Sequence, residues 1–388
     1  MSADSTSLLI LANSGRAIAE SAVRGGYRVT VIDTFCDEDT LAVADCWPAS
    51  HEFSRVDVDE LIEEMAALFP QHPCGVIYGA GLEQASSLLN RLSQHCRLFG
   101  NAPSVLERLR DPRRYFSLLN RLRIPYPEVC FTPPYSAPEK AWLIKRAGSC
   151  GGQGVAYFDP QHSATDSACY YQRHLTGSAM SILFIANGER FRTIGYNRLG
   201  TGASKAPAPF LYTGALGQAQ LQDDWRLQVE EIVRKLVGEL SLKGINSLDF
   251  ILNEDGIFVL DLNPRPSATL ELYEHLLSDG WVKHHIAACL GELPVLPIIG
   301  STVVHGHQIV YTPQTIEIPA DMAWPQWVKD RPSSGARIPE GQPLCSLFAR
   351  GGSEDEVEAV LCHYRDEILQ MLCPTTPQAQ AEMQKVAS

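Results

Sequence analysis

The chain has 388 residues, and its 32 lysines and arginines stand against 45 aspartates and glutamates, which gives a formal net charge of −13. This length is typical of two or three domains. A composition with 45% hydrophobic and 20% charged residues indicates a folded protein with a large core. The excess of negative charge argues against nucleic acid as a partner, because most of the surface would repel a polyanion. Only 8 of the 32 basic residues are lysines, and none precedes Lys140.

The cysteines and the apolar runs bear on the cellular compartment. Eleven cysteines without any C-x-x-C pair do not suit a disulfide framework or a zinc site. Reduced thiols in a cytoplasm are therefore expected. The apolar run at 8–12 is too short for a signal peptide, and no stretch approaches the roughly 20 apolar residues that cross a bilayer. We expect a cytoplasmic protein that does not bind membranes.

The first hundred residues alternate between strand-like and helix-like segments. In chain order the patterns predict a strand at 7–12, a helix at 16–24, a strand at 27–33, an amphipathic helix at 58–69 and a strand at 75–81. This alternation predicts a doubly wound α/β domain over 1–100 with a parallel sheet. The first turn contains one glycine, Gly15, whereas a dinucleotide fingerprint needs three. NAD and FAD are therefore not expected.

From about residue 101 the pattern changes to hairpins, helices and a proline-rich linker. In chain order it predicts a helix at 112–123, a linker at 132–138, strands at 141–145 and 155–158, a hairpin over 182–196, a helix at 225–240, a hairpin over 247–262, strands at 303–311 and 343–349, and a final helix at 354–371. We interpret these segments as an α+β domain over 101–295 and a small C-terminal β-rich domain with a final helix over 296–388.

A glycine-rich loop joins the predicted strands at 141–145 and 155–158. The loop begins three residues after Lys145, and its candidate phosphate-binding residues are Gly148, Ser149, Gly151, Gly152, Gln153 and Gly154. Backbone amides in such a loop can cover the phosphates of a nucleotide while the lysine neutralises their charge. The chain has no G-K-[ST] sequence, which excludes a Walker A loop. A flexible surface hairpin is the alternative interpretation.

Two aspartates lie on the predicted hairpin at 247–262. Asp249 and Asp261 are 12 residues apart on adjacent strands, and they face the same side if the register is even. Asn263 follows on that face, and Arg265 comes next between two prolines. Carboxylate and amide oxygens suit Mg²⁺ that carries phosphates, and a neighbouring arginine stabilises charge on a transferring phosphoryl group. The alternative is a solvated polar face on an edge hairpin.

Taken in order, these motifs resemble the ATP-grasp superfamily over residues 100–290. The matching features are the IPYP segment at 124–127, the lysine with its glycine loop, YYQRHL at 170–175, the paired acidic strands and the Asn-Pro-Arg segment at 263–265. The resemblance implies that ATP lies between two subdomains, one of them a mobile lid at about 128–180. It further implies that a carboxylate is phosphorylated to an acyl phosphate, which an amine then attacks.

The same resemblance implies a role for each matching residue. Lys145 would contact the phosphates and act in catalysis together with Arg265, which would steady the acyl phosphate. Mg²⁺ or Mn²⁺ would be held by Asp249, Asp261 and Asn263. The adenine edge would be met by Gln172, Arg173, His174 and Leu175. Gln172 replaces an acid in this pattern, and its amide can still accept from an exocyclic amine.

Several positions depart from the pattern. Relatives carry a lysine just before the helix at 112–123, where this chain offers Arg113 or Arg114 as an ATP-binding substitute. Lys205, in a Gly/Ala/Pro-rich loop, could reach ATP or be an ordinary solvated lysine. Ala179 stands where a ribose-binding polar group is often found. Thr269 stands where biotin carboxylases carry a glutamate, which counts against bicarbonate activation.

Shorter segments resemble a narrower branch, the predicted ATP-dependent carboligases linked to methanopterin-type and methanofuran-type one-carbon cofactors. They are located at 15–17, 33–39, 79–83, 212–214 and 341–351. The chemistry implied is amide formation, such as the addition of glutamate to a pterin or furan precursor. Candidate substrate contacts are Arg16, Glu83 and Ser267, and a solvated arginine is the alternative for Arg16.

The sequence thus predicts an ATP- and Mg²⁺-dependent carboxylate–amine ligase that forms an acyl phosphate. Its partners would be small carboxylates and amines, and a homodimer is the expected assembly. Two alternatives stay open: a phosphotransferase that stops at phosphorylation, and a nucleotide-binding regulator without turnover.

Overall fold

The computed structural model describes residues 7–49, 53, 63, 75–136, 138, 140–161, 166, 168–201, 207–297 and 303–373. Lys205 and nearly all of the helix predicted at 58–69 lie outside these residues. In the described part of the chain, the helices are all too short or too polar to cross a bilayer.

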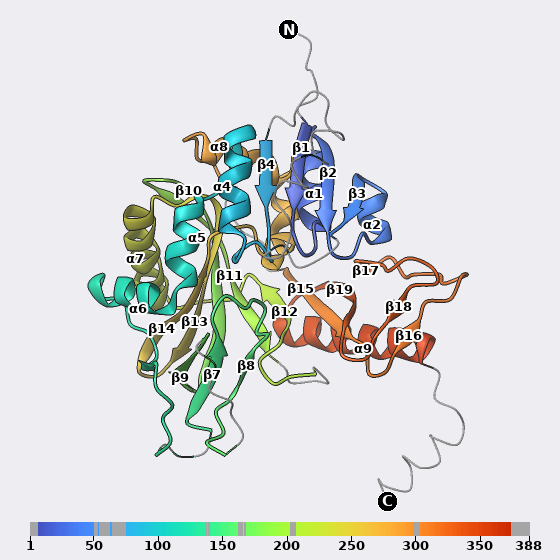
Figure 1. Cartoon of the computed structure of the whole chain (residues 1–388). Helices are drawn as coiled ribbons and strands as arrows, with labels where there is room; N and C mark the ends of the chain where they lie inside the picture. The colour runs from blue at the N-terminus through green and yellow to red at the C-terminus, as the bar shows by residue number, and fades with distance from the viewer. Residues whose placement is uncertain are drawn as a thin grey trace, which may run out of the picture.

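A five-stranded parallel sheet forms the N-terminal part, in the order β3-β2-β1-β4-β5. Its strands are β1 (Ser7–Leu11), β2 (Arg28–Asp33), β3 (Asp45–Pro48), β4 (Gly75–Tyr78) and β5 (Leu98–Phe99), and its helices are α1 (Arg16–Arg24), α2 (Glu38–Leu41) and α4 (Ser86–His95). The central strands β1 and β4 are almost wholly buried, which explains their continuous apolar sequence. The predicted parallel α/β architecture is confirmed, and its strands point with their carboxyl ends toward the rest of the molecule (Figure 1).

An eight-stranded sheet forms the centre of the molecule, in the order β14-β13-β10-β11-β12-β15-β19-β17. The strands are β10 (Ser178–Asn187), β11 (Phe191–Thr201), β12 (Tyr212–Gly217), β13 (Lys243–Asn253), β14 (Gly256–Asn263), β15 (Val304–Tyr311), β17 (Val328–Lys329) and β19 (Pro343–Gly351). Helix α7 (Asp223–Leu240) presents a buried stripe that includes Val229, Val233 and Leu236, and these side chains join the main core with β10 and β13.

Two short helices connect the N-terminal sheet to this centre. They are α5 (Pro103–Arg110) and α6 (Pro112–Arg121). Helix α6 begins at Pro112 as predicted, because Asp111 caps it by accepting from the amides of Arg113 and Arg114. Farther along the chain, the 3₁₀ segment η2 (Ala268–Leu276) and α8 (Trp281–Cys289) follow the acidic hairpin. Helix α8 packs Val282 and Ile286 into the core of the N-terminal sheet.

A separate four-stranded antiparallel sheet carries the glycine loop. Its order is β6-β9-β7-β8, with β6 (Val129–Cys130), β7 (Trp142–Arg146), β8 (Val155–Tyr157) and β9 (Cys169–Arg173). Trp142, Phe158 and Tyr171 form its own small core. In Figure 1 this sheet lies below α5 and α6, beside the eight-stranded sheet.

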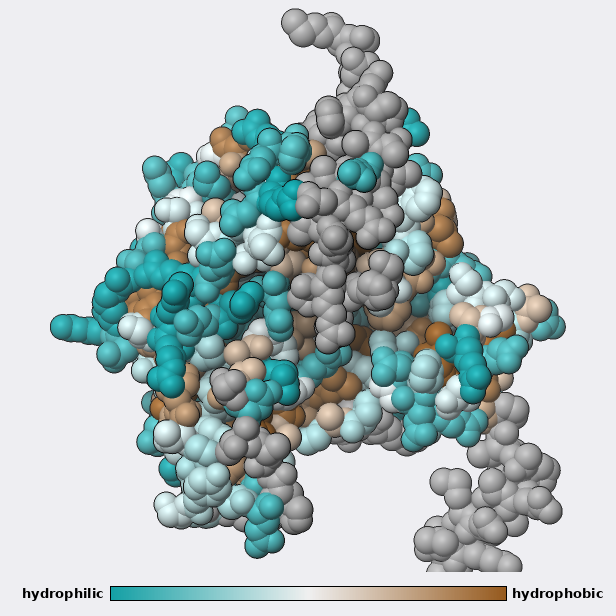
Figure 2. Space-filling model, in the orientation of Figure 1, coloured by the Kyte–Doolittle hydropathy of each residue, from teal (hydrophilic) through white to brown (hydrophobic). Residues whose placement is uncertain are grey.

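The C-terminal strands continue the eight-stranded sheet. Strand β15 pairs with β12, with Ala215 opposite His307, and β19 pairs with β15. The short ribbon of β16 (Ile316–Glu317) and β18 (Arg337–Ile338) and helix α9 (Glu354–Leu372) complete this part. Figure 2 shows that the visible face is mainly hydrophilic, with apolar residues in scattered patches.

Candidate active site

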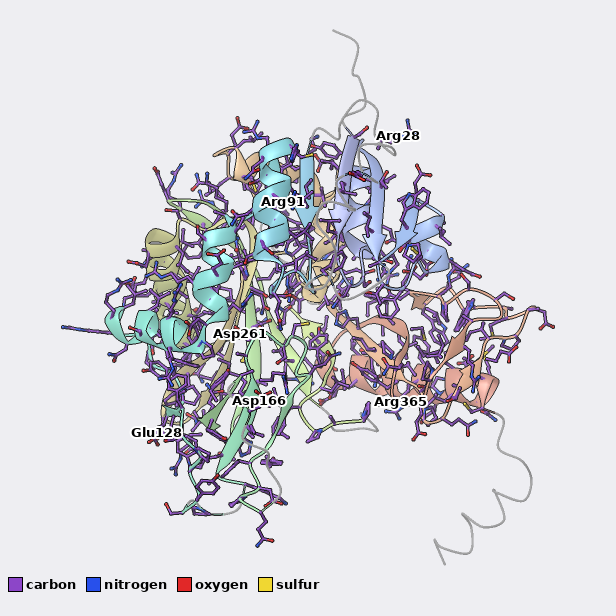
Figure 3. The ribbon with its side chains drawn as sticks, in the orientation of Figure 1. Arg28, Arg91, Glu128, Asp166, Asp261 and Arg365 are labelled. Atoms are coloured by element: carbon purple, nitrogen blue, oxygen red, sulfur yellow. The ribbon has the colours of Figure 1, made fainter. Side chains whose placement is uncertain are left out.

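A cavity of about 510 Å³ lies between the four-stranded sheet and the eight-stranded sheet. One wall comes from β7, β8, β9 and the glycine loop, and the opposite wall comes from β12, β13 and β14. The ends of α5 and α6 and Glu83 of the N-terminal part close the remaining side. Figure 3 shows Asp261 toward the middle of the molecule, which is where these elements meet.

The two aspartates of the acidic hairpin lie directly opposite one another. Strands β13 and β14 pair Asp249 with Asp261, and an irregularity next to this pair leaves Leu260 without a partner. Asn263 lies opposite Ser247, and its Nδ2 donates to Oδ2 of Asp249 at 3.1 Å. The even register that the sequence left open is therefore realised, and both carboxylates line the cavity.

The electrostatics of this pair suit a cation. Burial, and then the negative charge of Asp261, raise the pKa of Asp249 to about 7. Burial also raises the pKa of Asp261, although Lys145 and Arg265 oppose the shift. Asp261 still faces the open space of the cavity. Two close carboxylates with an amide oxygen beside them form the hard-oxygen donor set that Mg²⁺ prefers, so these residues fit the metal.

Arg265 is fixed by its neighbours beside the acidic pair. Its Nε donates to Oε1 of Glu83 at 2.7 Å, and its Nη2 donates to Oδ1 of Asn263 at 3.1 Å. The side-chain amide of Asn101 and the Tyr78 hydroxyl both donate to the carbonyl oxygen of Pro264, at 2.8 and 3.2 Å. Arg265 is only 7% exposed. Backbone and side chain are therefore preorganised, as an electrostatic catalyst requires.

Lys145 and Gln172 meet on the opposite wall. Lys145 Nζ donates to Gln172 Oε1 at 3.2 Å. Because an ammonium can only donate, this contact defines which end of the Gln172 amide carries oxygen. From the sequence we expected the Gln172 side-chain carbonyl to accept from the exocyclic amine of adenine. In the structure this carbonyl already accepts a hydrogen bond from Lys145. Arg173, His174 and Leu175 also line the cavity, and burial lowers the pKa of His174.

The glycine loop adopts a backbone that other residues would strain. Gly148, Gly151, Gly152 and Gly154 all have positive φ, between +61° and +77°. The cavity is lined by the first part of the loop, namely Gly148, Ser149, Cys150, Gly151 and Gly152. Gln153 and Gly154 belong to the same loop but are not among its lining residues.

Other predicted contacts lie away from the cavity. The Arg113 guanidinium stacks on Phe131, 4.1 Å from the ring centroid, and Arg114 pairs with Asp111 at 3.3 Å. Arg110 lines the cavity in their place. The sequence analysis did not select Arg110, because Arg110 lies before the start of the helix predicted at 112–123. It ends α5, two residues before Pro112, and belongs to the same cluster of arginines as Arg113 and Arg114.

Arg16 and Ser267 also do not line the cavity. Arg16 is 2% exposed and donates to both carboxylate oxygens of Glu271 at 2.6 and 2.7 Å, and to Asp330 at 2.7 Å. Ser267 shares a hydrogen bond of 2.9 Å with the Thr269 hydroxyl. Glu83, the third candidate substrate contact, does line the cavity.

Aromatic side chains that sequence reasoning did not select make up part of the walls. They are Tyr115, Phe116, Tyr157, Tyr170, Phe210 and Tyr212. Such rings offer flat apolar surface to a planar base. Tyr170 and Tyr212 lie in segments 170–175 and 212–214, which carry the resemblance. For Tyr115 and Phe116 the only signal was the amphipathic pattern of α6, which by itself also describes an ordinary core.

The described part of the chain has the ATP-grasp fold. Residues 110–269 match the family model of the ATP-grasp domain. The chain is similar in structure to the L-amino acid ligase from Bacillus licheniformis, with 16% identity, 93% of this chain and 97% of that chain covered, and a TM-score of 0.69.

Two further solved structures share the fold. One is a biotin carboxylase–beta-gamma-ATP complex from Campylobacter jejuni, with 13% identity, 92% and 89% coverage and a TM-score of 0.71. The other is the biotin carboxylase domain dimer of the Hydrogenobacter thermophilus 2-oxoglutarate carboxylase with MgADP, with 12% identity, 94% and 90% coverage and a TM-score of 0.69. At these identities the likeness establishes the fold, and the ATP-grasp fold predicted from the sequence is confirmed.

Proposed function

We propose that the protein is an ATP- and Mg²⁺-dependent carboxylate–amine ligase that works through an acyl phosphate. The observation that carries this proposal is the pairing of Asp249 with Asp261 across the cavity from Lys145, with Arg265 clamped beside them. Oxygen ligands on one wall and a lysine with a glycine loop on the other are the parts that phosphoryl transfer needs.

Asp249, Asp261 and Asn263 would hold the metal, which neutralises phosphate charge when it is bound. Lys145 and the amides of the glycine loop bind the phosphates from the opposite wall. In the first step a carboxylate oxygen bonds to the γ-phosphorus as the bond to ADP breaks. In the second step the amine bonds to the acyl carbon, the amine loses a proton, and inorganic phosphate leaves. Arg265 stabilises the negative charge on the phosphoryl group in both steps.

For the substrates, we propose an amino acid such as glutamate and a one-carbon cofactor precursor of pterin or furan type. The support is the resemblance of segments 79–83 and 212–214 to the carboligase branch, together with Glu83 and Tyr212 on the cavity wall. Thr269 in place of a glutamate argues against bicarbonate activation, even though biotin carboxylases share the fold. We also propose a cytoplasmic homodimer, which light scattering of the purified protein tests.

The decisive experiment incubates the protein with ATP, Mg²⁺, a panel of carboxylates and a panel of amines. The proposal expects ADP, phosphate and an amide, with turnover that depends on both substrates. Release of AMP and pyrophosphate would overturn the mechanism. ADP formation that needs no amine would favour the phosphotransferase, and calorimetric ATP binding without turnover in any mixture would favour the regulator.

A further inference from the structure

The glycine loop is held by two groups outside its own hairpin. The side-chain Nε2 of Gln84 donates to the carbonyl oxygen of Gly148 at 2.7 Å. The backbone amide of Tyr212 donates to the carbonyl oxygen of Gly151 at 2.8 Å. Gln84 belongs to the N-terminal part and Tyr212 begins β12, so the loop is attached to both bodies that it faces.

Gln84 lies in a short segment that also contacts Arg265 and Arg110. Its neighbour Glu83 accepts from Arg265 Nε through one oxygen and from the amide of Gly81 through the other, each at 2.7 Å. The backbone oxygen of Gln84 accepts from Arg110 at 3.4 Å. One stretch of backbone thus connects Arg265, Arg110 and the glycine loop.

Steric contacts show that the loop is seated tightly against these groups. A Cβ at Gly148 would lie 2.6 Å from Gln84 Nε2, and a Cβ at Gly152 would lie 1.8 Å from the carbonyl oxygen of Phe210. Gly151, between them, would meet no heavy atom within 4 Å. The loop therefore contacts Gln84 at Gly148 and residues 210–212 at Gly151 and Gly152, while the side of Gly151 on which a Cβ would lie faces open space.

We propose that Gln84 is a positioning residue that holds the glycine loop closed over the cavity and ties this closure to the Glu83–Arg265 wall. The catalytic consequence rests on the proposed function: a closed loop excludes water from the acyl phosphate until the amine attacks. A substrate that shifts Glu83 would thereby change the hold on Gly148, so substrate occupancy and loop closure are coupled through adjacent residues.

The first test needs no activity. Hydrogen–deuterium exchange of the peptide over 147–155 is compared between the wild type, Q84A, and Q84E, which keeps the size of the side chain but loses the donor. Loss of one side-chain hydrogen bond should speed exchange there about three- to tenfold. The matched control is Q220A, because Gln220 is also exposed and its Nε2 donates to a carbonyl oxygen in its own segment, that of Gln218. Unchanged exchange in both Gln84 variants would overturn the proposal.

The second test measures coupling. In Q84A and Q84E, more ADP should be released per amide formed than in the wild type, while Q84K, which restores an N–H donor, should recover coupling. A purely structural defect would lower both products equally and would contradict the positioning role. If exchange rises but ATP binds to no form of the protein, the proposed function fails while the attachment of the loop by Gln84 stands.

Discussion

Asp249 and Asp261 are direct partners across the β13–β14 ladder, and the pKa of Asp249 is raised to about 7 by its position in the cavity wall and by the nearby charge of Asp261. Two neighbouring carboxylates lower the free energy of unfolding unless a cation offsets their repulsion. The arrangement therefore connects the stability of the hairpin to the metal binding that we propose for it.

D261N should lower ADP release at least about a hundredfold, because it removes a charged oxygen from the proposed metal site. Initial rates over a range of Mg²⁺ concentrations measure this effect, and the thermal midpoint should be unchanged or raised. D255N is the matched control, since Asp255 lies in the exposed turn of the same hairpin. Equal losses of activity in both variants would contradict the assignment.

R110A should raise the KM for ATP about tenfold, because Arg110 lines the cavity and a charge-assisted contact would be lost. R113A should leave this KM nearly unchanged, since Arg113 stacks on Phe131 instead. Steady-state kinetics of the two variants decide between them. If R113A raised the KM for ATP more than R110A did, the ATP-binding role that the sequence predicted for Arg113 would be supported instead.

G152A should raise the KM for ATP more than G151A does. Both glycines have positive φ, so both variants suffer the same type of backbone strain. Only the Gly152 Cβ would collide with the Phe210 carbonyl oxygen, 1.8 Å away. The ratio of the two KM values therefore measures the effect of loop packing against Phe210, and we expect this ratio to be about tenfold or more. Equal effects would show that seating does not matter for nucleotide binding.

R16M should destabilise the protein by about 3–5 kcal/mol, because it removes a buried guanidinium and leaves the partly buried carboxylates of Glu271 and Asp330 without its charge. R24M should cost about 1 kcal/mol or less, because the Arg24–Glu274 pair includes an arginine side chain that is 39% exposed. Urea unfolding measures both. If Arg16 binds substrate, which was one of two interpretations of the sequence, then R16M also raises a substrate KM at temperatures where it is folded.

Asp37 should make stability depend on pH below neutrality. Burial, and then the charge of Asp330, raise its pKa from the usual 3.8 to about 6, so the folded state binds this proton more tightly than the unfolded chain does. The free energy of unfolding should therefore fall by up to about 3 kcal/mol as pH rises from 4 to 6 and then level off.

D37N keeps a capping acceptor for the Thr40 amide but cannot titrate. The difference in unfolding free energy between wild type and D37N, measured from pH 4 to pH 8, isolates the Asp37 proton from those of other groups. Parallel curves for the two proteins would contradict the shifted pKa.

Local patterns were sufficient for much of the fold. The strands at the N-terminus, the start of α6 at Pro112 and the final helix all follow from apolar periodicity and capping residues that lie next to one another in the chain. The hairpin that carries Asp249 and Asp261 was predictable for the same reason, because a four-residue turn places its strands side by side.

The continuation of the central sheet into the C-terminal part was not predictable in this way. Strand β15 pairs with β12, which lies about 90 residues earlier in the chain, and the sequence of neither strand indicates which strand it pairs with. The choice of Arg110 over Arg113 had the same origin, since the two arginines are three residues apart and only the packing of α5 and α6 decides which one faces the cavity.

The sequence by itself determined which chemical groups are present and which of them are local neighbours: the lysine with its glycine loop, the paired aspartates and the Asn-Pro-Arg segment. Only the tertiary structure decided how distant groups combine. Gln84 meets Gly148 across 64 residues, and Arg16 meets Glu271 across 255. Such contacts arise from the packing of whole sheets and helices, so the free energy that selects them depends on every residue in the interface, and no short pattern in the chain contains it.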